Sequence, residues 1–265
     1  MMVKKFGLRF LLLLSAFALI AAACGGDDDE DAGADDATAT ETDDGGDDAG
    51  SDDEGDDDAS TDDADDDGGA ASGEPQSGGT LVYATNQSPR HLNGTVQSGL
   101  ATAVPGTQVN ASPLFIDENY EPQPYLAESW EVAEDGLSVT LNLRDNAVFH
   151  DGEPITSEDV EFSILTSKEN HPFSAMFAPV ESVDTSDPLV AVINLSKPHP
   201  AILMAMSPGL LPIIPKHIFD DGQDIQAHPR NAGSDFVGSG PFQVVEYEEG
   251  ERIVLERFDD FFIEG

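Results

Sequence analysis

The residues of this chain that could carry chemistry are few and widely spaced. Six histidines stand at positions 91, 150, 171, 199, 217 and 228, and none belongs to an H-E-x-x-H pair or another tight zinc spacing. Cys24 is the single cysteine, and there is no G-x-S-x-G elbow or S-x-x-K motif. No glycine-rich phosphate loop follows a strand-like run. The pattern therefore favours binding over catalysis, with an exported hydrolase as the rival hypothesis.

Two motifs that contain acidic residues could still take part in chemistry. His150 and Asp151 are adjacent and could form an acid/base pair, but Asp151-Gly152 is turn chemistry, so we expect a structural turn there. A second motif fits the calcium loop D-x-D-x-D-G-x5-E, with no amphipathic helix on either side. Low-complexity sequence produces such a match by chance, so we expect no metal site and no cofactor. The second motif consists of Asp63, Asp65, Asp67, Gly68 and Glu74.

The N-terminus has the layout of a secretory signal. Lys4, Lys5 and Arg9 precede an uncharged apolar run from Phe10 to Ala23, which is shorter than the roughly 18 residues of a membrane-spanning helix. We expect residues 1–23 to be a signal peptide. The small residues before Cys24 resemble those of bacterial lipoproteins, which implies lipidation of Cys24. Cleavage without lipidation and an uncleaved anchor remain open.

Residues 24–79 predict an acidic, disordered tether. Asp27 to Glu74 contains 24 acidic residues, no basic residue and no aromatic residue. Such a segment cannot bury enough apolar surface to offset the entropy lost on ordering, and its like charges extend it. Even a neutral flexible chain of this length would span roughly 40 Å. The tether would hold a folded domain off the membrane.

The charge beyond the tether is also acidic. Eight basic and 29 acidic residues follow Glu74, for a net charge near −21. Nucleic-acid binding requires a basic footprint, so this composition argues strongly against it. Capture of an anion by a basic cleft is disfavoured for the same reason.

The elements that must position a site begin near Gly79. Residues 78–85 predict a first strand, followed by a turn at residues 86–89 and a mixed loop that contains Asn93-Gly94 and Pro105-Gly106. Residues 114–116 predict a short strand. From residue 137 to 143, leucine and valine alternate with polar residues, which indicates a strand with one buried face. Thr156 and Asp159 have capping-box-like spacing at the start of a predicted helix.

Later segments predict further strands and turns. Residues 189–195 form an apolar run, Pro200 could open a short helix, and strands are expected from about residue 242 and from Ile253 to Arg257 around a Glu249-Gly250 turn.

The order of these motifs resembles solute-binding protein family 5, the peptide-, dipeptide- and nickel-binding components of bacterial ABC importers. The resemblance runs from about Thr80 to the last residue. It is carried by Ala127-Glu128-Ser129-Trp130, Asp135-Gly136, Phe149-His150-Asp151-Gly152, Pro215-Lys216-His217, Gly238-Ser239-Gly240-Pro241-Phe242 and Phe261-Phe262 with Gly265. Ser239 stands where the family usually has threonine.

The resemblance implies an α/β fold of the periplasmic-binding-protein type II class. We expect residues 80–265 to be the first-lobe portion of a two-lobed protein with an inserted β-rich subdomain, and the second lobe to be absent. The implied function is capture of di- or oligopeptides for an ABC permease, with the protein exported and lipid-anchored, facing the periplasm or the cell exterior. Nickel or another small solute is the alternative within the family, and a surface-structural lipoprotein is the alternative outside it.

The candidate ligand contacts follow the predicted first strand. Asn86, Ser88 and Asn93 lie in the loop after it, and ligands of α/β sheets tend to bind at strand ends. An ordinary turn role is the competing interpretation for each residue. Much of the ligand pocket would come from the second lobe.

Overall fold

The computed structural model describes residues 78–263, which fall in one compact unit, Gln76–Gly265. Residues 1–77 and 264–265 lie outside the described residues. The predicted signal peptide at 1–23, the lipidated Cys24 and the tether at 24–79 therefore stay predictions. Within residues 78–263, no helix is long and apolar enough to cross a membrane.

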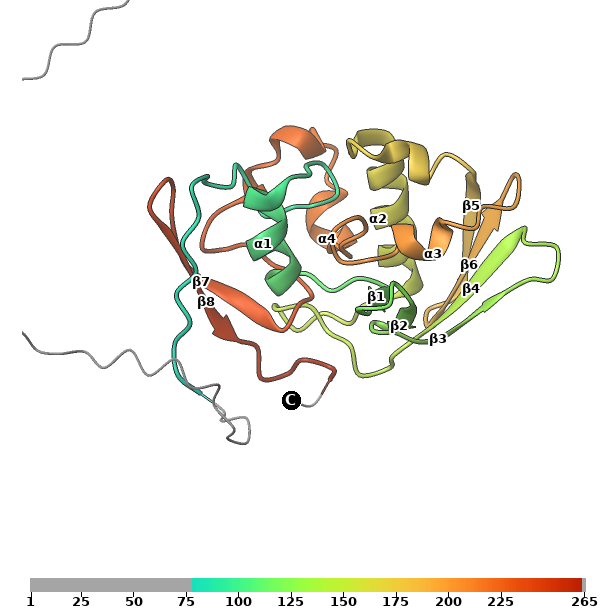
Figure 1. Cartoon of the computed structure of the whole chain (residues 1–265), viewed down its shortest axis with the longest axis horizontal. Helices are drawn as coiled ribbons and strands as arrows, with labels where there is room; N and C mark the ends of the chain where they lie inside the picture. The colour runs from blue at the N-terminus through green and yellow to red at the C-terminus, as the bar shows by residue number, and fades with distance from the viewer. Residues whose placement is uncertain (1–77, 264–265) are drawn as a thin grey trace, which may run out of the picture. The chain divides into compact units, whose positions relative to one another are not determined.

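A four-stranded antiparallel sheet forms one side of the described unit, in the order β3-β4-β6-β5 (Figure 1). Its strands are β3 (Ala127–Val132), β4 (Ser138–Leu143), β5 (Val180–Asp187) and β6 (Val190–Leu195). Burial alternates residue by residue along β4 and β6, as the period-2 pattern predicts. Strand β5 was not predicted, because its glutamate and aspartates mask the few apolar positions that face the core.

Helix α2 (Ser157–Asn170) covers this sheet and packs against β5 and β6. It starts where the capping-box spacing predicts, since the Thr156 N–H donates to Asp159 Oδ2 over 2.9 Å. Val160 and Ile164 are buried in the main core. The helix thus fixes one wall of the molecule for the segments that follow.

A smaller core lies under a second hairpin, made of β7 (Phe242–Glu248) and β8 (Arg252–Arg257). Leu92, Val109, Phe236 and Val244 are its buried members. Val109 ends helix α1 (Leu100–Val109), which packs against β7 (Figure 1). The mixed loop expected here was therefore wrong.

Helix α1 forms despite an unfavourable sequence. Pro105 lies inside it, where proline removes one helical hydrogen bond, and Gly106 adds a further propensity cost. Thr102, Gly106 and Val109 are buried. Tertiary packing of this face therefore outweighs the local preference for a loop.

The predicted first strand at residues 78–85 does not form. The segment has no regular secondary structure, and Leu81 and Val82 are 92% and 85% exposed. A strand is stabilised by pairing with a neighbour, and none of the strands described within residues 78–263 pairs with this segment. Its β-forming sequence alone is not enough.

The remaining elements are short. Strands β1 (Leu114–Ile116) and β2 (Pro122–Pro124) pair in a small hairpin. The others are α3 (Ile202–Ala205), α4 (Lys216–Phe219), η1 (Ser174–Met176), η2 (Ile225–Ala227) and η3 (Pro229–Asn231).

Candidate ligand-binding groove

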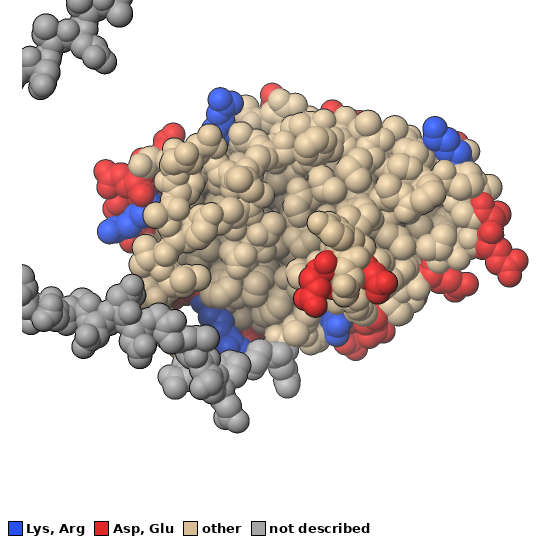
Figure 2. Space-filling view, viewed as in Figure 1, with Lys and Arg blue, Asp and Glu red and all other residues tan. Residues whose placement is uncertain are grey.

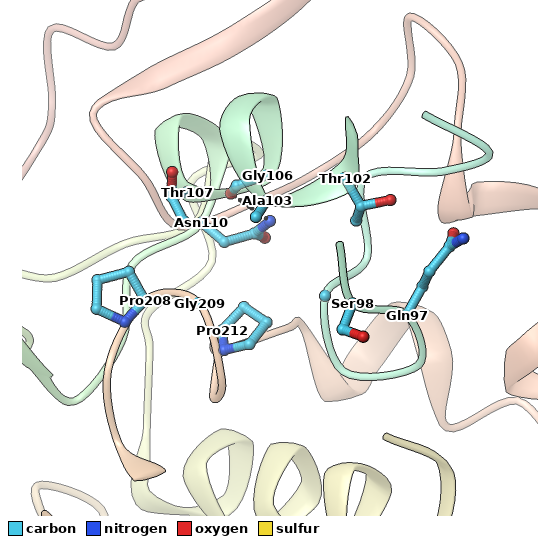
Figure 3. Close-up of a pocket in the computed structure, with 11 residues that line it drawn as sticks. Gln97, Ser98, Thr102, Ala103, Gly106, Thr107, Asn110, Pro208, Gly209 and Pro212 are labelled. Carbon is cyan, nitrogen blue, oxygen red and sulfur yellow. Dashed lines mark hydrogen bonds between the residues drawn. The ribbon is translucent and has the colours of Figure 1, made fainter. Parts of the chain in front are cut away.

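A groove runs along one face of α1 (Figure 3). It is small, with a cavity volume of about 20 Å³, and it is partly open to solvent. One wall is α1, the opposite wall is the loop at residues 208–212, and the loop before α1 closes one end. The lining residues are Gly94, Gln97, Ser98, Thr102, Ala103, Gly106, Thr107, Asn110, Pro208, Gly209 and Pro212.

The lining carries no charged side chain. Hydroxyl and amide groups alternate with glycine and proline surface, and the charged side chains visible on this face lie mostly toward its edges (Figure 2). Such a surface suits uncharged polar groups and short apolar groups of a ligand. It provides no basic side chain to capture an anion.

Asn110 fixes the end of α1 against the loop that precedes the helix. Its side-chain Nδ2 donates to the carbonyl oxygens of Gly106 over 3.0 Å and of Leu92 over 3.2 Å. Both acceptors are carbonyls, so the orientation of the amide follows from its partners. Asn110 is 1% exposed and is a structural member of the groove wall.

The two walls are joined by the hydroxyl of Ser239. This oxygen accepts from the N–H of Ala111 over 2.9 Å and donates to the carbonyl of Ile213 over 2.8 Å. Ile213 also donates its N–H to the Ala111 carbonyl over 2.8 Å. Ala111 follows Asn110 and Ile213 follows Pro212, so this cluster sets the separation of the walls beside the groove.

Glycine flanks Ser239 on both sides because α1 passes too close for a side chain. The Gly240 N–H donates to the Val109 carbonyl over 3.0 Å. A Cβ added at Gly240 would lie 2.5 Å from the Gln108 carbonyl oxygen, and one at Gly238 would collide with the Val109 carbonyl. The Gly-Ser-Gly sequence is thus a steric requirement of this crossing.

His150 holds the two glycines. Its Nδ1 accepts from the Gly238 N–H and its Nε2 donates to the Gly240 carbonyl, each over 3.1 Å. A backbone N–H can only donate and a carbonyl can only accept, so the ring is the neutral Nε2–H tautomer. Burial lowers the pKa of His150, and the hydrogen bond to Gly240 and the nearby Asp151 oppose that shift.

The turn that carries His150 is the one the sequence predicts. Gly152 donates its N–H to the Phe149 carbonyl over 2.9 Å and has a φ of +87°. Asp151 does not pair with His150 but with the Nε2 of His217, over 2.8 Å. His150 and Asp151 therefore do not form an acid/base dyad.

The three predicted ligand contacts are placed very differently. Asn86 and Ser88 are exposed in the irregular segment and do not line the groove. Asn93 is fully buried next to the lining residue Gly94. Its Nδ2 donates to Asn231 Oδ1 over 2.9 Å, and its Oδ1 accepts from the N–H and hydroxyl of Thr95. These bonds give Asn93 a structural role, and a ligand role for any of the three stays a prediction.

Sequence reasoning missed most of the groove because it treated residues 100–109 as a loop. Thr102, Gly106 and Asn110 recur at intervals of four, and Ala103 and Thr107 lie beside them, so one helical face carries all five. The spacing was a signal for such a face. Pro105 obscured it.

Comparison with known proteins places the chain in a family. The profile described as "Bacterial extracellular solute-binding proteins, family 5 Middle" matches residues 121–265, which is more than half of the chain. The chain belongs to this family. The resemblance drawn from the motifs is thereby confirmed.

Family 5 relatives cover most of the folded unit. A putative ABC transporter peptide-binding protein of Brucella ovis is 28% identical over 197 residues, 66% of this chain and 37% of the relative. The oligopeptide-binding protein AppA of Bacillus subtilis is 27% identical over 72% of this chain and 36% of its own length. The chain thus spans little more than a third of these relatives.

Solved structures of similar proteins agree with the fold. NikZ from Campylobacter jejuni, in complex with Ni(L-His), has a TM-score of 0.61 at 30% identity and covers 67% of this chain and 35% of its own. AppA from Bacillus subtilis, in complex with a nonapeptide, has a TM-score of 0.62 at 25% identity and covers 71% and 38%. These are type II periplasmic binding proteins, so the predicted α/β class is confirmed for the part of the fold that this chain covers.

Proposed function

We propose that this family 5 protein captures di- or oligopeptides outside the cytoplasm and delivers them to the permease of an ABC importer. Family membership over residues 121–265 carries the proposal, supported by relatives named for peptide binding. The uncharged groove beside α1 is our candidate for the surface that this part of the protein presents to the ligand. Polar groups of peptide backbone match its hydroxyls and amides.

The mechanism proposed is capture without chemistry, so the protein is not an enzyme. Two lobes would close on the ligand by hinge bending and present a surface to the permease. The part described here would contribute one wall of the cleft. We expect residues 80–265 alone to bind peptides weakly, because closure needs both lobes.

We further propose that the protein is exported and anchored by a lipid on Cys24, with residues 24–79 as a spacer. The order of basic, apolar and small residues before Cys24 supports this. Replacing Cys24 with serine removes the only thiol. The variant should lose incorporation of labelled palmitate and appear in the soluble fraction, whereas equal membrane retention would refute the anchor.

The test of peptide capture is calorimetry on the product of the complete gene with dialanine, trialanine, tetra-alanine and penta-alanine. We expect saturable binding of at least one peptide. Parallel titrations with nickel–histidine and heme address the alternatives, because relatives are named for these ligands. Binding of nickel or heme without any peptide would overturn the peptide assignment but keep solute capture.

A further inference from the structure

We propose that His150 is a positioning residue of the groove and that its neutral ring makes ligand affinity sensitive to acid. The proposal rests on the groove being a ligand surface of the proposed function. It arises from a chain of contacts that leads from the imidazole to both walls.

The chain of contacts has three links. His150 binds the backbone of Gly238 and of Gly240 through its two ring nitrogens. These glycines hold Ser239 between them. The Ser239 hydroxyl is bonded to Ala111 at the end of α1 and to Ile213 beside the opposite wall.

Apart from the bond from the Ile213 N–H to the Ala111 carbonyl, each wall is anchored to a separate element. The Ile214 N–H donates to Ser163 Oγ of α2 over 3.0 Å, which ties the 208–212 wall to the main core. Val109 at the end of α1 belongs to the smaller core under β7 and β8. The Gly238–Gly240 segment therefore bridges two cores, and a loss of order there shifts one wall against the other.

Protonation of His150 removes one link directly. An imidazolium has two N–H donors and no acceptor, so Nδ1 can no longer accept from the Gly238 N–H, and two donors then face each other. The ring packs edge-to-face against Phe258, with the two centroids 4.9 Å apart. Loss of this bond loosens the Gly238–Gly240 bridge between the two walls, which lowers the affinity of the groove for its ligand.

Few charged groups lie near the His150 ring. On its own turn the nearest is Asp151, which is engaged by His217. On the β8 side, Arg257 and Asp259 flank Phe258 in sequence and are exposed. The groove lining contributes no charge. The Gly240 carbonyl and the Asp151 carboxylate thus favour the protonated ring, and burial, the larger effect, lowers the pKa of His150.

The experiment compares the wild-type product of the complete gene with His150→Gln. A glutamine amide offers one acceptor and one donor, as the neutral imidazole does, but does not titrate. The Kd for the alanine peptide that binds best is measured at about pH 7.5 and in steps down to about pH 4, because burial holds the pKa of His150 below the usual histidine value. Wild type should weaken by about fivefold, the value of one hydrogen bond, while His150→Gln should change little.

His171→Gln is the matched control, because burial lowers the pKa of His171 as it does that of His150, but His171 lies outside the groove and its bridge. It should keep the wild-type pH dependence of Kd. Equal pH dependence in wild type and His150→Gln would overturn the proposal, with peptide capture intact.

A second pair of variants covers the case in which His150→Gln fails to fold. Ser239→Ala removes the hydroxyl that joins the walls, whereas Ser239→Thr keeps it. Affinity at about pH 7.5 should fall by about fivefold or more in Ser239→Ala and recover in Ser239→Thr. No loss in Ser239→Ala would refute the bridge.

Hydrogen exchange measured without ligand distinguishes failure of the His150 bridge from failure of peptide capture. Protection of the Gly238 and Ala111 amides against hydrogen exchange should fall in acid in wild type more than in His150→Gln. If no peptide binds at any pH, peptide capture is refuted and the affinity claim falls with it. If peptides bind and amide protection is equal in the two proteins, only the His150 proposal is refuted.

Discussion

Replacing Asn93 with alanine should separate its structural role from a ligand role. The side chain is fully buried and makes three hydrogen bonds, one to Asn231 at 2.9 Å and two to Thr95 at 3.0 and 2.6 Å. A typical hydrogen bond contributes about 1 kcal/mol net, so the variant should lose about 3 kcal/mol of unfolding free energy. Thr95 and Asn231, which would lose these bonds, are themselves buried, so the loss of about 3 kcal/mol is a lower estimate.

The assay is urea unfolding of the wild-type chain and Asn93→Ala at neutral pH, with peptide affinity measured on the same variant of the complete gene product. Ser88→Ala and Asn86→Ala are matched controls from the same predicted site, because both side chains are exposed. We expect each control to stay within about 0.5 kcal/mol of wild type. Unchanged stability in Asn93→Ala together with lost peptide binding would refute the structural reasoning and restore the ligand role.

Three further predictions concern stability. Burial lowers the pKa of His150 and His171, so below about pH 6.5 the unfolded chain takes up protons more readily than the folded chain. The free energy of unfolding, measured in urea, should therefore fall as the pH drops through that value, and it should fall less in His150→Gln and in His171→Gln. Gly240→Ala should cost about 3 kcal/mol in urea unfolding, whereas Gly209→Ala, whose Cβ meets nothing within 4 Å, should be nearly neutral; equal effects would contradict the packing argument. Ile164→Ala should cost about 2–5 kcal/mol by leaving a core cavity, and a loss under 1 kcal/mol would show that the core collapses around it.

The sequence predicted those elements whose signals are local. The alternation of residues 137–143 identified β4, and the Thr156 to Asp159 spacing identified the start of α2. Neither depends on distant partners, because a half-buried strand and a helix cap are both visible within a few residues.

Elements that depend on distant contacts were missed or misplaced. Residues 78–85 have strand-forming residues but no strand to pair with among those described. Helix α1 contains Pro105 and Gly106 and forms because its buried face meets the β7–β8 hairpin. Local propensity therefore predicted a strand that does not form and missed a helix that does, because tertiary contacts decide both cases.

The site also divides into features with a local sequence signal and features that depend on distant contacts. Asp151-Gly152 was correctly read as a turn, but the bond from His150 to Gly238 spans 88 residues of sequence and has no local signal. Two of the motifs that carry the resemblance to family 5, Phe149–Gly152 and Gly238–Phe242, therefore meet in space through the ring of His150.

This meeting explains why the family motifs reveal so little about the ligand. Residues of these motifs form hydrogen bonds that join separate backbone segments. The Ser239 hydroxyl, for example, accepts from the Ala111 N–H and donates to the Ile213 carbonyl. The groove surface comes instead from residues 94–110 and 208–212, which lie outside both motifs. Under the proposed ligand role of the groove, ligand preference should follow residues 94–110 and 208–212. Exchanging residues 97–107 with those of a relative should then shift preference without the loss of folding expected from a change at Gly240.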